Sequence, residues 1–99
     1  MAFTEYQKKR TQERVKIAFG KVLKKYREDK GLTQEKLGGE ADYHSTYISQ
    51  LERGLKQPSL TTIIVLAKCL DIKPEVIIKA VGKKLTIPQR RVTLKKKSK

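Results

Sequence analysis

Residues 42–54, DYHSTYISQLERG, place short hydrogen-bonding side chains on one side of a predicted helix. At about 100° per residue, Ile48 and Leu51 define the buried side of this helix. The opposite side then carries three neutral polar residues and one arginine, namely Thr46, Ser49, Gln50 and Arg53, with Ser45 on its flank. Solvated helix faces of a basic protein usually carry Lys and Glu, whereas compact donors and acceptors suit the base edges of a DNA groove. The pattern therefore favours a surface that recognises a partner by hydrogen bonding.

Catalytic and metal-binding chemistry has little support in the sequence. His44 is the single histidine and Cys69 the single cysteine, and neither has further residues at metal-ligand or nucleophile–base spacing. The pair Gly38-Gly39 matches no phosphate-binding loop. Glu52 is better interpreted as a structural partner of a nearby Lys or Arg than as an acid catalyst. We expect no enzyme, metal or cofactor, His44 at the surface or a DNA edge, and Cys69 in packing, with redox sensing as the lesser alternative.

Length and charge limit the class of protein. The 99 residues suffice for one domain, and 37% hydrophobic residues with 6% aromatics and no Trp predict a small aliphatic core. A net charge of +14 indicates a polyanionic partner, with nucleic acid first and an anionic membrane surface second. No run is long and apolar enough to span a membrane, no signal-peptide pattern opens the chain, and one Cys fits a reducing compartment. We therefore expect a cytoplasmic location without a membrane partner.

The positive charge is concentrated at the two ends of the chain. Residues 1–30 hold ten Lys/Arg against four Asp/Glu, residues 31–75 hold five against six, and residues 76–99 hold nine against none. A near-neutral middle between two basic ends suits a folded unit whose cationic extensions reach a polyanion.

Apolar periodicity and capping residues predict five helices. The first spans residues 13–30 and ends at Gly31, and the second follows a Thr33 cap over residues 34–41. The third spans residues 45–53, and the fourth, capped by Ser59, spans residues 60–70. Pro74 opens a fifth helix that ends near Gly82. Residues 1–12 form either a basic arm or an extension of the first helix, residues 13–82 the domain, and residues 83–99 a basic tail with a short edge strand as an alternative.

Two predicted helices carry wide apolar surfaces. The fourth places Leu60, Ile63, Ile64, Ala67 and Leu70 on one face and other apolar residues elsewhere, which predicts a central, multiply packed helix. The apolar set of the fifth helix is too wide for a single buried stripe. We expect one edge of the fifth helix to face another subunit. The residues expected at this dimer interface are Val76, Ile77, Ile78 and Val81.

The second and third predicted helices, joined by a short turn, form a helix-turn-helix candidate. Residues 31–74 resemble the Cro/phage-repressor type (XRE-like) of helix-turn-helix domain, in the ordered motifs LTQEKL, TYISQLERG, PSLTTI and LAKCLDI. The resemblance implies an all-α, five-helix, lambda-repressor-like fold. It also implies base reading by early residues of the third helix and phosphate contacts by its flanks. The implied base-reading residues are Ser45, Thr46, Ser49 and Gln50, and the implied phosphate contacts are Gln34 and Arg53. Two further residues are candidates for phosphate contact on their own chemistry: Tyr47, divided between packing and a phosphate or sugar contact, and His44 at the DNA edge.

Three residues depart from the pattern of this family. Gly38 stands where Ala is usual, Asp42 replaces the usual turn glycine, and His44 replaces Ser or another good helix cap. The first two exchanges are expected to be sterically mild. His44 is a poor N-cap, so the family pattern does not by itself fix where the third helix starts or where Ser45 points.

The sequence thus predicts a regulator of transcription that binds double-stranded DNA as a homodimer on a pseudo-palindromic operator. The alternatives are an antitoxin that represses its own operon with a protein partner, and a bridging coactivator that uses the same fold for protein contacts. RNA and membrane binding have less support, because no aromatic platform or coherent apolar tail is visible. Phosphate attraction is assigned to the basic arm and tail, at Lys8, Lys9, Arg10, Lys83, Lys84, Arg90, Arg91, Lys95, Lys96, Lys97 and Lys99.

Overall fold

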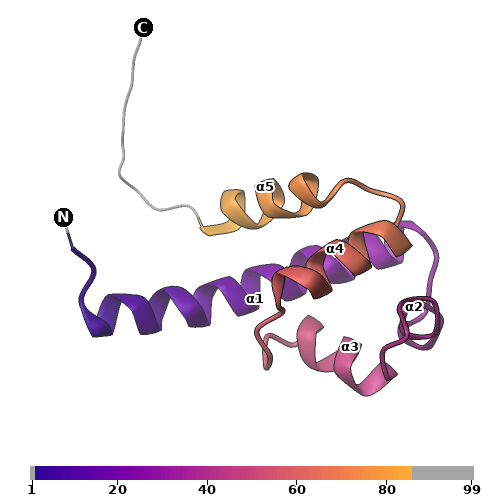
Figure 1. Ribbon diagram of the computed structural model, residues 1–99, viewed down its shortest axis with the longest axis horizontal. Helices are drawn as coiled ribbons and strands as arrows, with labels where there is room; N and C mark the ends of the chain where they lie inside the picture. The colour runs from indigo at the N-terminus through magenta and orange to yellow at the C-terminus, as the bar shows by residue number, and fades with distance from the viewer. Residues whose placement is uncertain (1, 86–99) are drawn as a thin grey trace, which may run out of the picture.

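Five α-helices make up the described part of the chain in a computed structural model that describes residues 2–85. They are α1 (Glu5–Asp29), α2 (Gln34–Ala41), α3 (Ser45–Glu52), α4 (Leu60–Cys69) and α5 (Pro74–Leu85). The predicted all-α, five-helix fold is confirmed. Helix α1 is the long axis of the molecule; α5 runs back along it, while α2 and α3 lie on its other side (Figure 1).

Polar caps and glycines fix the helix ends close to where the sequence places them. The Thr33 and Ser59 hydroxyls accept hydrogen bonds from the backbone N–H groups of Lys36 and Thr62, both at 3.0 Å. Each bond satisfies a donor that the first turn leaves unpaired. Gly31 and Gly54 follow α1 and α3 with φ of 78° and 74°, a left-handed conformation that costs glycine little. Helices α2 and α3 are short as a result, with eight residues each.

The core is aliphatic and small, as the composition predicts. Its fully buried large side chains come from all five helices, so no helix buries its apolar face alone. They are Phe19, Val22 and Leu23 of α1, Leu37 of α2, Ile48 and Leu51 of α3, Leu66 of α4 and Ile77 of α5. Ile48 and Leu51, the two anchors expected for the third helix, have no exposed surface. The opposite side of α3 therefore faces outward.

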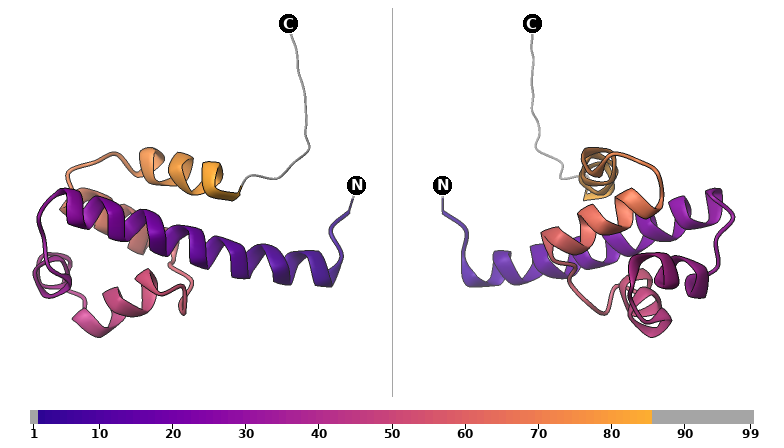
Figure 2. Two further views of the ribbon diagram at one scale, coloured as in Figure 1. Left: turned by 180° about the vertical axis from the view of Figure 1, so that it is seen from behind. Right: turned by 45° about the vertical axis from the view of Figure 1, so that its right-hand side comes forward.

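Residues 5–12, for which the sequence left an arm or a helical extension open, are helical. The Thr4 hydroxyl accepts from the Gln7 backbone N–H at 3.1 Å, and the Gln7 side chain accepts from the Thr4 N–H at 2.9 Å. This reciprocal capping box starts α1 eight residues before the expected position. The Thr-x-x-Gln spacing at residues 4–7 is the sequence signal for it. The first half of α1 extends beyond the other helices in every view (Figures 1 and 2).

The structure corrects the predicted faces of α4 and α5. Leu60 and Ile64 are 69% and 41% exposed, because α4 turns its Thr62, Leu66 and Ala67 side inward instead. In α5, Ile77 is fully buried and Val81 is 8% exposed. These two pack within the core of the subunit, so their assignment to a dimer interface is wrong. Of the four residues expected at that interface, Val76 and Ile78 remain on the surface, at 38% and 50% exposed.

Helix α5 continues past Gly82 to Leu85, three residues beyond its expected end. Leu85 packs against the core, and its carbonyl oxygen accepts a hydrogen bond from Arg14 Nη2 at 2.7 Å. This tertiary contact outweighs the roughly 1 kcal/mol that an internal glycine costs a helix. Lys83 and Lys84 are therefore helical. The suggested edge strand and Arg90, Arg91, Lys95, Lys96 and Lys97 lie outside the described residues.

Candidate nucleic-acid interface

Helices α2 and α3 meet through a turn that permits close backbone approach. Asp42 adopts φ 60° and ψ 40°, the left-handed conformation expected for the turn position. A Cβ atom added at Gly38 would lie 2.5 Å from the Tyr43 carbonyl oxygen, a distance that real Cβ atoms do not tolerate. The expectation that glycine at residue 38 is a sterically mild exchange is therefore wrong. In this chain the turn presses against α2, and only glycine fits beneath it.

The outward side of α3 carries the predicted base-reading residues. Thr46 is exposed, and Ser45, Ser49 and Gln50 are half-buried, while the buried Ile48 and Leu51 hold the helix from behind. Arg53 Nε donates to Ser49 Oγ at 3.3 Å, so these two lie side by side on the exposed surface. The geometry presents hydroxyl, amide and guanidinium groups from a single helix. Such groups have the size and hydrogen-bonding capacity that base edges in a major groove require.

His44 caps α3 despite being a rare residue at that position. Its backbone is extended, and its Nδ1 atom accepts a hydrogen bond from the Thr46 backbone N–H at 3.1 Å. The expected start of the third helix at Ser45 is confirmed. The cap requires an imidazole whose Nδ1 carries no proton, because a protonated ring nitrogen cannot accept. His44 therefore holds the end of α3 on which Ser45 and Thr46 lie.

An ion pair joins the end of α3 to α1. Arg27 donates from Nη2 to Glu52 Oε1 at 2.9 Å and from Nε to the other carboxylate oxygen, and the side chains are 10% and 3% exposed. Arg27 Nη1 donates to the Leu32 carbonyl oxygen at 2.8 Å. Hydrogen bonding to Glu52 raises the pKa of the Arg27 guanidinium, which stays charged. The structural role expected for Glu52 is thereby confirmed.

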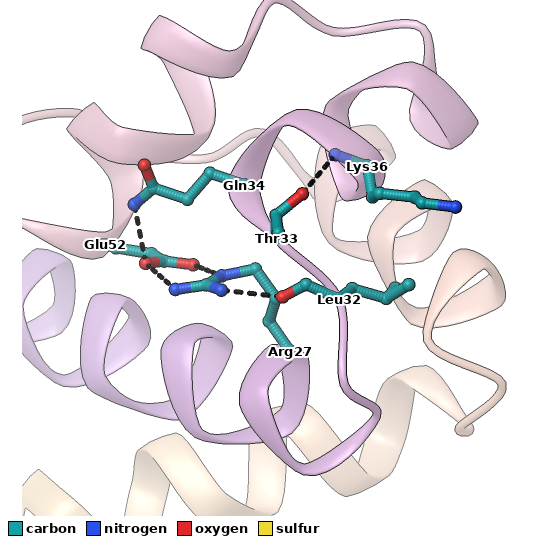
Figure 3. A network of polar contacts seen from close by, with 6 residues as sticks. All are labelled: Arg27, Leu32, Thr33, Gln34, Lys36 and Glu52. Atoms are coloured by element: carbon teal, nitrogen blue, oxygen red, sulfur yellow. Dashed lines mark hydrogen bonds and ion pairs between the residues drawn. The ribbon is translucent and has the colours of Figure 1, made fainter.

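Gln34, the first residue of α2, extends the same network. Its Nε2 atom donates to Glu52 Oε1 at 3.0 Å (Figure 3). The side-chain amide has two N–H donors and one carbonyl acceptor, and this bond occupies one donor. The second N–H and the carbonyl stay available at the start of α2. The network therefore fixes the direction of a residue predicted to contact phosphate (Figure 3).

Four hydroxyl groups meet where α3, the turn and α4 come together. Thr62 Oγ1 lies 3.1 Å from the Ser59 hydroxyl, which donates to it, 3.1 Å from Tyr43 OH and 3.4 Å from Tyr47 OH. A threonine hydroxyl accepts at most two hydrogen bonds and donates one. One tyrosine must therefore donate to Thr62 and the other accept from it. The accepting tyrosine keeps a phenolic O–H that can be donated elsewhere.

The two tyrosines also pack on each other, with ring centroids 5.1 Å apart in an edge-to-face arrangement. Tyr47 was predicted to divide between packing and a phosphate or sugar contact, and the structure shows the packing part of this role. Tyr43 and Thr62 were missed, because neither belongs to the expected outward face of α3. Thr62 is 5% exposed while its neighbour Thr61 is exposed, so the sequence, which has both at the start of α4, does not mark the buried one.

The basic residues predicted to bind phosphate lie on two helix ends. Lys8, Lys9 and Arg10 are exposed in the first part of α1, and Lys83 and Lys84 are exposed in the last turn of α5. These two ends approach each other, since Arg14 contacts Leu85. The end of α5 therefore lies beside α1, about one to two helical turns after the basic residues Lys8, Lys9 and Arg10.

The single cysteine, Cys69, is shielded by the fold. Burial, together with the negative charge of Glu40, raises the pKa of the Cys69 thiol, which disfavours the reactive thiolate. Cys69 is half-buried and packs against the core. Within residues 2–85, no group of three or more His, Cys, Asp or Glu side chains could hold a metal ion. The same residues contain no helix long and apolar enough to cross a membrane.

Known proteins match both the sequence and this geometry. A family model described as helix-turn-helix matches residues 23–77, which includes α2, α3 and α4 entirely. The control protein C.BamHI of Bacillus amyloliquefaciens is 39% identical over 62 residues, covering 62% of this chain and 76% of that protein.

Solved structures agree with the sequence matches. The restriction-modification controller protein C.AhdI of Aeromonas hydrophila is 37% identical, with a TM-score of 0.61 over 63% of this chain and 94% of that one. The controller protein C.Esp1396I, solved as a tetramer in complex with its natural 35-base-pair operator, is 27% identical, with a TM-score of 0.66 over 74% of this chain and 96% of that one.

Proposed function

Since the chain belongs to the helix-turn-helix family, we propose that it is a sequence-specific DNA-binding regulator of transcription. It acts as a repressor or autoregulator and binds a pseudo-palindromic operator as a homodimer in a bacterial cytoplasm, associated with the nucleoid when bound. The observation that carries the proposal is the outward side of α3. There a protein of charge +14 presents neutral hydrogen-bonding groups, supported by two fully buried anchors.

Base reading and phosphate anchoring fall to different groups. Ser45, Thr46, Ser49 and Gln50 contact base edges from α3, since they alone combine outward placement with short donors and acceptors. Phosphate contacts come from the charged and fixed donors around that helix. They are the second N–H of Gln34, the spare tyrosine O–H beside Thr62, Arg53, and His44 at the cap.

The basic ends supply attraction that does not depend on sequence. Lys8, Lys9, Arg10, Lys83 and Lys84 are exposed, and the chain carries six further cations after Leu85. Each phosphate that a cation neutralises releases counterions, which makes binding steeply salt-dependent. A chain lacking residues 86–99 should bind operator and random DNA more weakly to a similar degree, with a shallower dependence of affinity on salt. An unchanged salt slope would remove those residues from the phosphate contacts.

Dimerisation matches one recognition helix to each half of a palindrome. Half-sites then lie one helical turn apart, about 34 Å between centres. Val76 and Ile78, both exposed on α5, are the surface residues that remain of the expected dimer face. The relative C.Esp1396I occupies its operator as a tetramer, which supports assembly on DNA in this group of proteins.

Selection of bound DNA from a random pool at physiological salt tests the proposal most directly. Enrichment of an inverted repeat with half-sites one helical turn apart is the expected result. A bound pool with the same sequence composition as the starting pool would overturn sequence-specific binding by the native chain. A small protein that co-purifies with the chain would favour the antitoxin alternative, which also binds an operator, whereas the absence of an operator footprint would favour the bridging coactivator.

A further inference from the structure

The first half of α1 is a helix that the folded body does not cover. Every residue from 2 to 14 is exposed, and this part of α1 projects past the other helices (Figure 2). It also lies outside residues 23–77, which the helix-turn-helix model matches. A capping box at Thr4 and Gln7 nevertheless gives it a defined start. A capped, projecting helix presents a fixed set of side chains to a partner.

One side of this helix carries four residues that we call the α1 stripe: Tyr6, Arg10, Glu13 and Ile17. At 100° per residue they fall within about 60° of one another. Phe19, Leu23 and Tyr26, which face the core, lie on the opposite side of the helix. Tyr6 is 68% exposed and Ile17 is 49% exposed, both unusual for large apolar side chains. The stripe is therefore a surface turned away from the subunit's own core.

The order of residues in the α1 stripe is self-complementary. Residues 6 and 17, and residues 10 and 13, are placed symmetrically about one midpoint between residues 11 and 12. When two copies run antiparallel about that midpoint, Tyr6 meets the other copy's Ile17, and Arg10 meets its Glu13. Each contact occurs twice, as a twofold axis between identical subunits requires.

The contacts that Arg10 and Glu13 make within one subunit are weak enough to be replaced by contacts with a second copy. Arg10 Nη1 donates to Tyr6 OH at 3.3 Å, and its guanidinium lies 5.8 Å from the centre of the Tyr6 ring. Glu13, whose side chain is 63% exposed, forms an ion pair at 3.1 Å with Lys16, whose side chain is 21% exposed. Exposed pairs of this kind contribute only about 0.2–1 kcal/mol, so exchange for a partner across an interface costs little.

The body adds an apolar patch at one end of the α1 stripe. Gly54 packs closely against Ile17, since a Cβ atom added at Gly54 would lie 3.1 Å from its Cα and Cγ1 atoms. The next residue, Leu55, is 55% exposed. Tyr6 of a second copy that covers Ile17 would reach this neighbourhood as well.

From this pattern, we propose that the α1 stripe pairs antiparallel with the α1 stripe of a second copy of this chain. Two Arg10–Glu13 ion pairs form at the centre, with Tyr6 packed on Ile17 at each end. The pairing uses Arg10, one of the cations assigned to DNA. Lys8, which points to the opposite side of α1, stays available for phosphate.

Charge reversal of the full-length chain, measured as self-association without DNA by sedimentation equilibrium, tests the pairing. Arg10→Glu or Glu13→Arg alone should weaken self-association by roughly fivefold or more, because each sets like charges opposite each other twice. The double variant Arg10→Glu/Glu13→Arg should restore it, since the two charges only exchange places. Lys8→Glu, with the same change in net charge as Arg10→Glu but on the opposite side of α1, is the matched control and should leave self-association unchanged.

Equal loss in Lys8→Glu and Arg10→Glu, or no rescue in the double variant, would overturn the proposal. A loss of DNA affinity in Arg10→Glu with unchanged self-association would instead assign Arg10 to DNA. Because the measurement contains no DNA, failure of the pairing leaves operator selection untouched, and failure of operator selection leaves the pairing testable.

Cross-linking tests the direction of the helices. In a Cys69→Ala background, a mixture of Tyr6→Cys and Ile17→Cys chains should form a disulfide-linked heterodimer under mild oxidation. Residues 6 and 17 of one chain are about 16 Å apart along the helix, too far for a bond within a subunit. Either single variant alone should stay monomeric on a non-reducing gel. Dimers from the Tyr6→Cys chain alone would indicate parallel pairing and overturn the proposal.

Discussion

Arg27 of α1 and Glu52 of α3 form an ion pair whose side chains are 10% and 3% exposed. The pair joins the longest helix of the fold to the last residue of the helix that carries the proposed base-reading residues. Glu52 also accepts from Gln34, so one carboxylate fixes both helices of the helix-turn-helix against α1. Few other polar contacts reach so far into this small aliphatic core.

Loss of one partner of this pair should be costly. Glu52→Gln leaves the Arg27 guanidinium buried without a counter-charge, and we expect a loss of about 3–5 kcal/mol in the free energy of unfolding. The double variant Arg27→Met/Glu52→Leu removes both charges and should be more stable than Glu52→Gln. Urea unfolding followed by circular dichroism measures both. A Glu52→Gln chain as stable as the native one would show that the pair adds nothing to stability.

A methyl group at Gly20 should separate α1 from α3. A Cβ atom there would lie 2.5 Å from the carbonyl oxygens of Leu51 and Glu52, and backbone cannot move aside as a flexible side chain does. We expect Gly20→Ala to destabilise the fold by more than about 1 kcal/mol, although alanine favours helix. Gly39→Ala is the control, since nothing lies within 4 Å, and it should raise the melting temperature. Equal effects from the two variants would contradict the close packing.

The cap of α3 can be improved. His44 accepts one bond from Thr46 N, a task for which Asn or Asp is better suited. His44→Asn should keep or increase stability, whereas His44→Ala should lose about 0.5–2 kcal/mol. Thermal unfolding at neutral pH compares the three chains. If His44→Ala matches the native chain, the observed hydrogen bond does not stabilise α3.

If α3 reads bases, then removing a side chain from its outward side should reduce the difference in affinity between operator and random DNA. Ser49→Ala or Thr46→Ala should lower affinity for the selected operator by about 1–3 kcal/mol while affecting random DNA much less. Lys83→Ala, at an exposed cation of α5, is a useful comparison, because it should weaken both DNAs alike and reduce the salt slope. Competition binding on the two DNAs separates these outcomes. Equal weakening of both DNAs by Ser49→Ala would remove that residue from base readout.

Cys69 should react slowly in the folded chain. Burial raises the pKa of its thiol above the usual value of 9.0, so less thiolate is present near pH 8 than in the unfolded chain. Iodoacetamide should therefore modify native Cys69 more slowly than urea-unfolded Cys69. The stability linked to this shift is present below the usual thiol pKa and is lost as pH rises through the higher folded value. Equal rates in both states would contradict the shielding.

Local sequence patterns were sufficient for several elements. Thr33, Ser59, Gly31 and Gly54 mark helix ends through bonds and backbone angles that depend on immediate neighbours alone. The spacing of Ile48 and Leu51 was enough to determine which side of α3 is buried. Even the unexpected start of α1 was present in the sequence, as the Thr-x-x-Gln capping box at residues 4–7.

Contacts between distant residues decided the rest. Apolar spacing could not distinguish the buried Ile77 and Val81 from the exposed Val76 and Ile78, because all four are equally hydrophobic and only α1 and α4 determine which side of α5 is covered. The length of α5 depends on Arg14, 71 residues away from Leu85 in sequence. Glycine at residue 38 is required by the Tyr43 carbonyl, and the meeting of Tyr43, Tyr47 and Ser59 at Thr62 needs three elements in place. The sequence by itself determined the helices and the outward side of α3, because those depend on local spacing; the tertiary structure decided which surfaces stay free for a partner, because burial depends on the neighbours that folding brings together.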